Sequence, residues 1–229
     1  MLYTRQSARD NIRNRDGKRV FYLGHGDQLT ADARDWLQSQ RIEILPAEQA
    51  KPEKWRLLSG GWSEEKPEHM THLDGMTLVS KTHPRIAFRG AMDNLEAELL
   101  LCCLETGEDK LLQILEQARM LLRCDVLGEP VPEKPLCGMT PEQLRSRSHR
   151  PQDYYGQPHF MPDVRDGRKL LLLNKARCAA RQAELAAAHA FCDRDGNPTR
   201  PDILQALNRM SSMLYLLMIE QKANHPIKE

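Results

Sequence analysis

Residues 168–191 read RKLLLLNKARCAARQAELAAAHAF, and this stretch decides the fold class. Its apolar residues recur every three or four positions, which is the period of an α-helix. The apolar line consists of Leu173, Ala176, Ala180, Ala183 and Ala187. A long helix with such a face needs other helices to cover it, so the stretch predicts a helical bundle.

Helical periodicity marks three other long segments of the chain. They lie at about residues 83–102, 109–126 and 201–222, and each carries an apolar face. The segment 128–165 is rich in proline and is expected to be mostly loop, with one short helix from Thr140. The sequence therefore predicts a mainly α protein built on a bundle of four to five helices.

The N-terminal part of the chain reads differently. Residues 1–18 are polar and basic, and we expect them to be loose. After them come a short strand at 19–23, a helix at 29–37 that Thr30 is placed to cap, and an alternating strand at 41–45. This order predicts a small α/β appendage of the βαβ kind.

The domain organisation follows from a change in composition. Residues 46–70 contain prolines, many lysines and glutamates, and a Gly-Gly pair, which is typical of a linker. We therefore expect an N-terminal appendage with its linker at residues 1–70 and a helical-bundle domain at residues 71–229.

The charge balance excludes some classes of partner. The 229 residues carry 33 Lys+Arg against 32 Asp+Glu, a net charge of +1, which argues against a nucleic-acid binder or a polybasic membrane protein. The longest apolar runs, 170–173 and 213–219, are far shorter than a membrane span. The N-terminus lacks an apolar signal core, so we expect a cytoplasmic protein.

Polar residues also recur at helical spacing. Asn174, Arg177, Arg181 and Glu184 form one stripe beside the alanine line of residues 168–191. Two arginines and a carboxylate in a row are suited to cradle a polyphosphate, because guanidinium offers planar, bidentate donors. A solvated helix face with ion pairs one turn apart explains the pattern equally well. The last helix has a second polar line of Asn208, Ser212 and Tyr215.

The segment before the first long helix offers phosphate-binding groups. It contains the turn residues Thr71, Asp74, Gly75 and Thr77, followed by Lys81, and so supplies hydroxyls, backbone N–H groups and an ammonium. An ordinary turn is the alternative reading. The nearby histidines lack the Cys or acidic neighbours of a metal site, so none is expected.

Four stretches together resemble a known family. They are KTHPRIAFRGAMDNL at 81–95, HFMP at 159–162, the Arg177, Arg181 and Glu184 helix, and RPDILQALNRMS at 200–211. Their order and spacing resemble the cobalamin adenosyltransferases, specifically the ethanolamine-utilisation type and more distantly the propanediol-utilisation type. The resemblance covers about residues 71–222.

The resemblance implies a trimer of helical bundles with active sites between subunits, which transfers the 5′-deoxyadenosyl group of ATP to cob(I)alamin. By its pattern the ATP-binding residues would be Thr71, Asp74, Gly75, Thr77, Lys81, Arg181, Glu184 and Asn208. The corrinoid-binding residues would be Asp93, His159, Phe160, Met161 and Arg177. Among these, Asp93 and Arg177 resemble the pair that closes the corrinoid site, and Phe160 the aromatic below cobalt.

The implied chemistry fits these residue types. An apolar side chain at the lower axial position leaves cob(II)alamin four-coordinate and easier to reduce. The cob(I)alamin formed attacks the ribose 5′-carbon of ATP, and Mg²⁺, Lys81, Arg177 and Arg181 stabilise the leaving triphosphate. The resemblance further implies an electron donor such as a flavoprotein and a downstream adenosylcobalamin-dependent lyase or dehydratase. It places the protein in ethanolamine or diol catabolism, with a bacterial microcompartment as the specific site.

Two departures from the family pattern bear on the prediction. Many ethanolamine-type members carry an H-x11-C-C-x2-C metal motif before the position of Thr71, but residues 61–70 here contain no cysteine, so no structural zinc or iron is expected. Ser212 stands where propanediol-type proteins usually have Asp. Two alternatives remain open: a non-catalytic corrinoid carrier or sensor, and a structural helical protein of a microcompartment.

Overall fold

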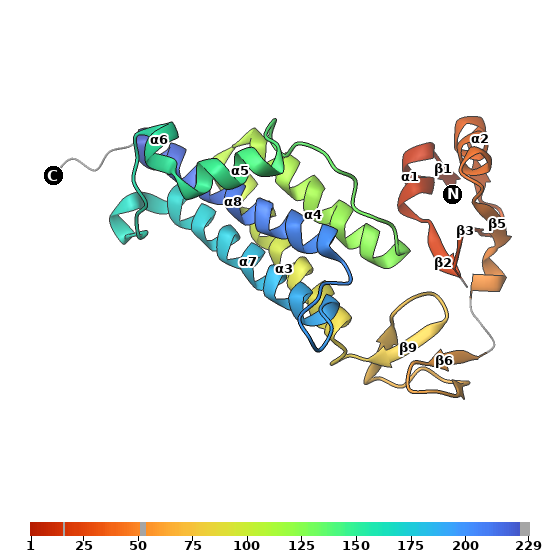
Figure 1. Ribbon diagram of the computed structural model, residues 1–229. Coiled ribbons are helices and arrows are strands. Elements are labelled where there is room, and N and C mark those ends of the chain that lie inside the picture. The colour runs from red at the N-terminus through yellow and green to blue at the C-terminus, as the bar shows by residue number, and fades with distance from the viewer. Residues whose placement is uncertain (16, 51–53, 225–229) are drawn as a thin grey trace. The chain divides into compact units, whose positions relative to one another are not determined.

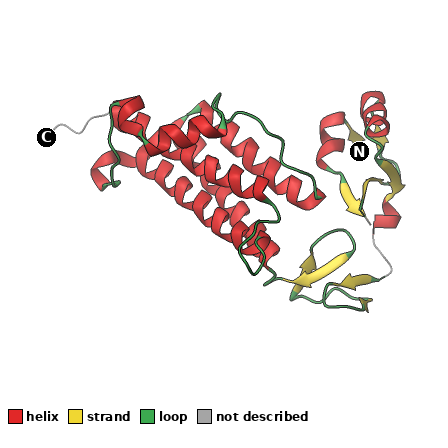
Figure 2. Ribbon diagram, in the orientation of Figure 1, coloured by secondary structure: helices red, strands yellow, loops and turns green. Residues whose placement is uncertain are grey.

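The computed structural model describes residues 1–15, 17–50 and 54–224. The chain forms two compact units (Figure 1). The first consists of Met1–His83 with Val126–Gly128, and the second of Pro84–Asp125 with the residues from Glu129 onward. Strands occur in the first unit, whereas the second is built from helices (Figure 2).

The first unit is built from short helices and strands, whereas the second is built mainly from long helices. The first unit contains β1 (Leu2–Tyr3), α1 (Arg5–Asp10), β2 (Arg13–Arg15), β3 (Lys18–Leu23), β4 (Gln28–Leu29), α2 (Ala31–Ser39), β5 (Glu43–Pro46), a 3₁₀ turn (Ala47–Ala50), β6 (Trp55–Leu57), β7 (Trp62–Ser63), β8 (Met70–His72) and β9 (Thr77–Ser80). The second contains α3 (Pro84–Thr106), α4 (Asp109–Leu127), α5 (Pro141–His149), α6 (Pro151–Tyr155), a 3₁₀ turn (Val164–Asp166), α7 (Gly167–Phe191) and α8 (Pro201–Asn224).

The expected βαβ unit is confirmed. Strands β3 and β5 pair in parallel, with Phe21 opposite Ile44, and α2 connects them. Thr30 caps α2, since its side chain accepts a hydrogen bond from the Ala33 N–H. Phe21 and Leu37 are fully buried in the small core between helix and sheet.

The expectation that residues 1–18 are loose is wrong for the described residues. Thr4 and Ser7 form a capping box at the start of α1, and β2 pairs antiparallel with β3. Ala8 and Ile12 are buried in the same core as Phe21. The sequence signal was weak because only a few apolar residues, Tyr3 among them, anchor the segment.

The interpretation of residues 46–70 as a linker is also wrong, except that residues 51–53 lie outside the described part. This segment contributes β6, β7 and the first residue of β8 to a four-stranded sheet with the order β7-β6-β9-β8. Strand β6 pairs in parallel with β9, with Arg56 opposite Thr77. By its contacts the sheet belongs to the first unit, so the compact units divide after His83 and not at residue 70.

Helix α7 is the central element of the helical unit. It packs along most of its length against both α3 and α8. The line of alanines predicted as its apolar face is buried, with Ala176, Ala180, Ala183 and Ala187 fully inaccessible. Because alanine has a short side chain, the neighbouring helices can approach α7 closely.

The predicted helices are found within a few residues of their expected bounds. On α3 the predicted apolar face, from Phe88 to Cys102, is the face that is buried. Thr140 caps α5 through a capping box with Gln143. Helix α6 was not predicted, because it is a five-residue helix in a proline-rich segment. No helix in the described ranges is both long and apolar enough to cross a membrane.

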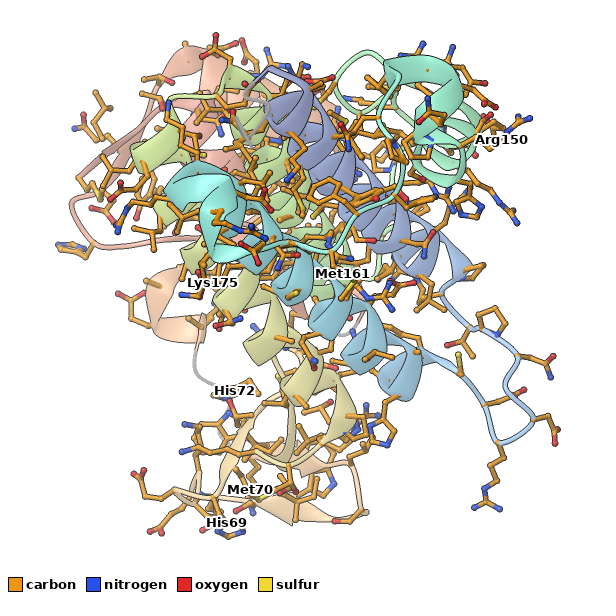
Figure 3. The ribbon with its side chains drawn as sticks, turned by 90° about the vertical axis from the view of Figure 1, so that its left-hand side faces the viewer. His69, Met70, His72, Arg150, Met161 and Lys175 are labelled. Carbon is orange, nitrogen blue, oxygen red and sulfur yellow. The ribbon has the colours of Figure 1, made fainter. Side chains whose placement is uncertain are left out.

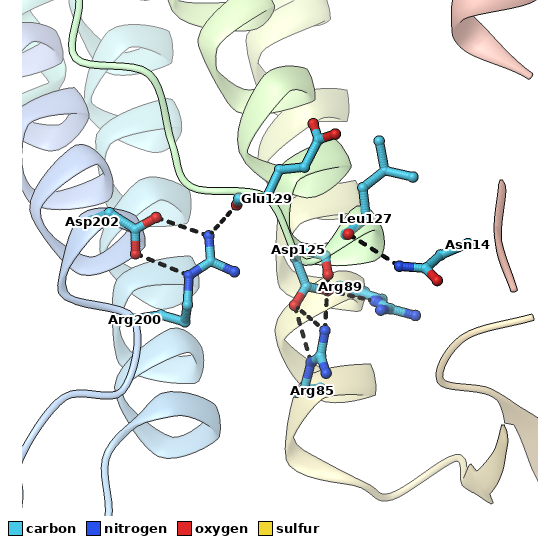
Figure 4. Close-up of polar contacts among 8 residues, drawn as sticks. All are labelled: Asn14, Arg85, Arg89, Asp125, Leu127, Glu129, Arg200 and Asp202. Atoms are coloured by element: carbon cyan, nitrogen blue, oxygen red, sulfur yellow. Dashed lines mark hydrogen bonds and ion pairs between the residues drawn. The ribbon is translucent and has the colours of Figure 1, made fainter. Parts of the chain in front are cut away.

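Two clamps of charged residues fix the helical unit (Figure 4). The fully buried Asp125 carboxylate on α4 accepts hydrogen bonds from Arg85 (Nη2 at 2.7 Å) and Arg89 (Nε at 2.8 Å) on α3. At the start of α8, Arg200 donates to both carboxylate oxygens of Asp202. These hydrogen bonds lower the pKa of Asp202 to about 2, against the opposing effect of burial.

Candidate functional site

The polar stripes of α7 and α8 meet across the helix interface. The amide nitrogen of Asn208 on α8 donates to Glu184 Oε1 on α7 at 2.7 Å. The amide oxygen of Asn208 in turn accepts from Arg209 Nη2 at 2.5 Å. Both Glu184 and Asn208 are half-buried. The carboxylate of Glu184 is therefore held in a fixed position by the neighbouring helix.

The two arginines of the stripe lie on the same face of α7. Arg177 donates from Nε and Nη2 to the side-chain oxygen of Asn174, at 3.3 and 3.2 Å. Its guanidinium also lies 5.8 Å from the centre of the Tyr215 ring on α8. Arg181, one turn further along, is exposed.

Neither guanidinium is neutralised within the described residues, since no ion pair joins Arg177 or Arg181 to a carboxylate there. Within the described residues Arg177 and Arg181 thus lack the ion pairs of the alternative reading, but Arg181 is exposed, so a solvated helix face stays open as the alternative. Two cations without an acidic partner, beside an oriented carboxylate and an amide, make a site suited to a polyanion.

The loop before α7 lies on α8 through aromatic contacts. The rings of His159 and Phe160 stack on Tyr215 with centroid distances of 5.7 and 6.3 Å. The ammonium of Lys222 lies 5.2 Å from the Phe160 ring and forms an ion pair with Asp166. These contacts hold Phe160 half-buried on the surface of the helical unit.

Met161, the next residue of this loop, points away from the helices. Its side chain, labelled in Figure 3, is 88% exposed. A large apolar side chain at such exposure, next to a stacked aromatic cluster, offers an apolar contact for a planar ligand.

Asp93 is exposed on α3 and is not joined to Arg177 by an ion pair among the described residues. The direct partner of Arg177 is Asn174 instead. The pairing of Asp93 with Arg177 at a corrinoid site stays a prediction.

The predicted phosphate-binding turn lies in the first unit, between β8 and β9. Asp74 Oδ1 accepts from the backbone N–H groups of Met76 and Thr77 at 3.0 and 2.8 Å, which closes the turn. A Cβ atom at Gly75 would lie 2.5 Å from the backbone oxygen of Asn14, so only glycine fits there. Asp74 and Gly75 thus have structural roles, and their contact with ATP stays a prediction.

The remaining residues of this segment differ in whether a hydrogen bond already occupies their side chains. Thr77 is buried, and its hydroxyl accepts from Arg56 Nη2 at 3.2 Å. Thr71 is half-buried on β8 and Lys81 is exposed after β9, and within the described residues no hydrogen bond occupies either side chain. The side chains of Thr71 and Lys81 are therefore available to a ligand.

A protein-bound metal was not expected, and three structural observations bear on that expectation. Within the described ranges no three His, Cys, Asp or Glu side chains gather in one place. His69 and His72 are exposed on the sheet of the first unit (Figure 3). Burial raises the pKa of Cys102 to about 12, which disfavours the thiolate that a metal requires.

Sequence reasoning missed the contacts that organise the site. Tyr215 was noted only as part of a polar line, and Lys222 was not singled out. A usable signal existed for Tyr215, because it lies seven residues after Asn208 and therefore on the same face of α8. No local pattern indicates that its partners come from the loop before α7.

Comparisons with known proteins agree on one family. The family model described as cobalamin adenosyltransferase matches residues 63–221. The protein named corrinoid adenosyltransferase EutT of Salmonella typhimurium is 33% identical over 224 residues, which are 96% of this chain and 83% of the relative. EutT of Escherichia coli is 32% identical over the same shares of the two chains.

A solved structure shares the fold. It is a variant of the PduO-type ATP:corrinoid adenosyltransferase from Lactobacillus reuteri, complexed with cobalamin and ATP. The similarity has a TM-score of 0.50 at 16% identity and covers 69% of this chain and 91% of the other. The expected mainly α fold is thereby confirmed.

Proposed function

The chain belongs to the cobalamin adenosyltransferase family, and we propose that it transfers the 5′-deoxyadenosyl group of ATP to cob(I)alamin, giving adenosylcobalamin and triphosphate. It is a corrinoid adenosyltransferase of the ethanolamine-utilisation type. In the reaction the C5′–O bond of ATP breaks, a cobalt–carbon bond forms, and the triphosphate leaves with the bonding electron pair.

One observation carries this proposal. Arg177 and Arg181 lie on one face of α7 without a carboxylate partner in the described residues, beside the carboxylate that Asn208 orients. A triphosphate leaving group develops negative charge, and preorganised guanidinium groups stabilise that charge. A corrinoid carrier or sensor has no use for such a pair, so the geometry favours the enzyme over this alternative.

The residues divide between the two substrates. We assign ATP binding to Thr71, Asp74, Gly75, Thr77, Lys81, Arg181, Glu184 and Asn208. We assign corrinoid binding to Asp93, His159, Phe160, Met161 and Arg177. The stacked position of Phe160 supports its role at the lower face of the corrinoid, where an apolar ring excludes water and the lower ligand from cobalt.

A magnesium ion is expected to enter with ATP. Mg²⁺ is commonly held by substrate phosphates, water and one or two carboxylates, and Glu184, which Asn208 orients, fits that need. When bound, the ion would neutralise part of the triphosphate charge.

The assembly and partners of the enzyme belong to the same proposal. We propose the homotrimer that the family resemblance implies. An electron donor such as a flavoprotein supplies the reduction, and an adenosylcobalamin-dependent lyase or dehydratase uses the product. The site of action is the cytoplasm, within a microcompartment.

An anaerobic assay tests the function directly. The protein is mixed with MgATP, cob(II)alamin and a mild reductant, while the visible spectrum and the triphosphate released are followed. We expect a light-sensitive adenosyl product with one triphosphate per corrinoid. A changed cob(II)alamin spectrum without product would indicate a carrier or sensor, and an unchanged spectrum would contradict the proposal altogether.

Arg181→Ala tests the triphosphate site. A hydrogen bond to a charged group contributes about 1.5–3 kcal/mol, so kcat/KM for ATP should fall about 10- to 150-fold. Arg168→Ala is the matched control, because Arg168 is an exposed arginine of the same helix whose partner is Glu105. Normal kinetics in Arg181→Ala would mean that Arg181 belongs to a solvated helix face and not to the triphosphate site.

Chelation tests the expected independence of structural metals. The residues before Thr71 lack the cysteine motif of many ethanolamine-type members, so chelators selective for zinc or iron should leave activity intact once Mg²⁺ is replenished. Activity with metal-free protein plus MgATP is compared with the untreated enzyme. Inactivation that added zinc or iron reverses would reveal a metal site.

A further inference from the structure

Tyr215 joins two parts of the helical unit that lie far apart in the chain. Its side chain projects from α8, where the ring stacks nearly parallel to that of His159, with an interplanar angle of 13°. Phe160 stacks on it at 25°, and the guanidinium of Arg177 lies 5.8 Å from its centre. One side chain thus contacts the loop before α7 and the polar stripe of α7.

The hydroxyl of Tyr215 adds a directed contact. It lies 2.9 Å from His159 Nδ1, while His159 Nε2 lies 3.2 Å from the backbone oxygen of His149. A backbone oxygen only accepts, so Nε2 carries the proton and Nδ1 of the neutral ring accepts from the tyrosine hydroxyl. His159 is therefore held at both nitrogens, by α8 and by the end of α5.

The backbone next to His159 is held at the same point. Burial raises the pKa of Tyr215, against the opposing effects of a hydrogen bond from the Phe160 backbone and of the charge of Arg177. The Tyr215 hydroxyl thus meets polar groups of both His159 and Phe160. Tyr215 therefore contacts the Phe160 ring directly and also binds His159, the residue before it.

We propose that Tyr215 is a positioning residue that, together with His159, latches the Phe160 loop onto α8 and so sets the place of the Phe160 ring below the corrinoid. This inference rests on the proposed function, because it takes Phe160 to face the corrinoid. Arg177 lies against the same ring, so the latch also aligns the loop with the triphosphate site.

Tyr215→Phe tests the latch, because it removes the hydroxyl and keeps the ring. With ATP bound, we expect the four-coordinate cob(II)alamin signal in electron paramagnetic resonance to fall by about three- to tenfold, as expected for the loss of one hydrogen bond. The KM for ATP and the rate with chemically pre-reduced cob(I)alamin should stay within about twofold. Tyr215→Leu, which also removes the stacking surface, should lower the signal further.

Tyr154→Phe is the matched control. Tyr154 is an exposed tyrosine of α6 whose hydroxyl lies 2.9 Å from Ser146 Oγ, so the same atom is removed away from the loop. We expect this variant to match the wild type. A Tyr215→Phe signal equal to that of the wild type would overturn the latch. An equal loss of rate from cob(II)alamin and from pre-reduced cob(I)alamin would overturn it as well.

A second readout does not depend on the reaction. The ¹⁵N chemical shifts of the His159 ring in the ligand-free protein should show a protonated Nε2 and a hydrogen-bonded Nδ1, and the Nδ1 shift should change in Tyr215→Phe. An unchanged shift would contradict the latch even if the enzyme is active. Failure of the wild type to form adenosylcobalamin, with the histidine shift as expected, would instead contradict the proposed function.

Discussion

Phe160→Ala is expected to slow adenosylation that starts from cob(II)alamin by about 10²-fold, since loss of correct positioning at a reacting centre has effects of that size. The ring that excludes axial ligands from cobalt is removed, so reduction becomes harder. Adenosylation of chemically pre-reduced cob(I)alamin should change much less, because that route bypasses the reduction step. Initial rates of both routes, measured anaerobically, give the comparison.

Val164→Ala serves as the control for this experiment. Val164 follows in the same loop and is 83% exposed, so its truncation removes apolar surface without touching the stacked cluster. Its rates should match the wild type on both routes. Equal losses on the two routes in Phe160→Ala would discard the axial role and leave Phe160 as a residue that shapes the loop.

Asp125→Ala is expected to lower the free energy of unfolding by about 3–5 kcal/mol, the usual cost of removing one partner of a buried ion pair. The Asp125 carboxylate is fully buried, and the partly buried Arg85 and Arg89 both donate to it. Without it both guanidinium groups lose these charge-assisted bonds, whereas the bond from Arg85 to the Asp125 backbone oxygen remains. Urea denaturation measures the change.

Two further variants serve as comparisons for this unfolding measurement. Asp125→Asn keeps one side-chain acceptor and should lose less stability than Asp125→Ala. Glu105→Ala removes the acid of an exposed pair with Arg168 and should lower the free energy of unfolding far less than Asp125→Ala. An Asp125→Ala loss no larger than that of Glu105→Ala would show that the clamp does not stabilise the helical unit.

The helical unit was predictable because its signals are local. The apolar faces of α3 and α7, the Thr140 cap of α5 and the turn that begins at Asp193 depend on residues a few positions apart. The strands of the first unit depend instead on pairing at a distance, as when β6 pairs with β9 some twenty residues later. The segments of β6 to β9 are short and no periodic pattern marks them, whereas β3 and β5 were expected from the sequence.

The candidate site was predictable in part for the same reason. The stripe of Arg177, Arg181 and Glu184 is visible because a helix brings residues three and four apart onto one face. The sequence left open whether these residues pair with one another. The structure decides that question, since Glu184 is bound by Asn208 from α8.

By itself the sequence determined the helical bundle, the family and the residue types of the site, because each depends on the spacing of residues that lie close together in the chain. Only the tertiary structure decided that the Asp125 carboxylate binds two arginines of α3, and that the rings of His159 and Phe160 both stack on Tyr215. Such contacts join residues 36–56 positions apart. They form only when packed helices bring those residues together, and the spacing of nearby residues in the sequence does not indicate how the helices pack.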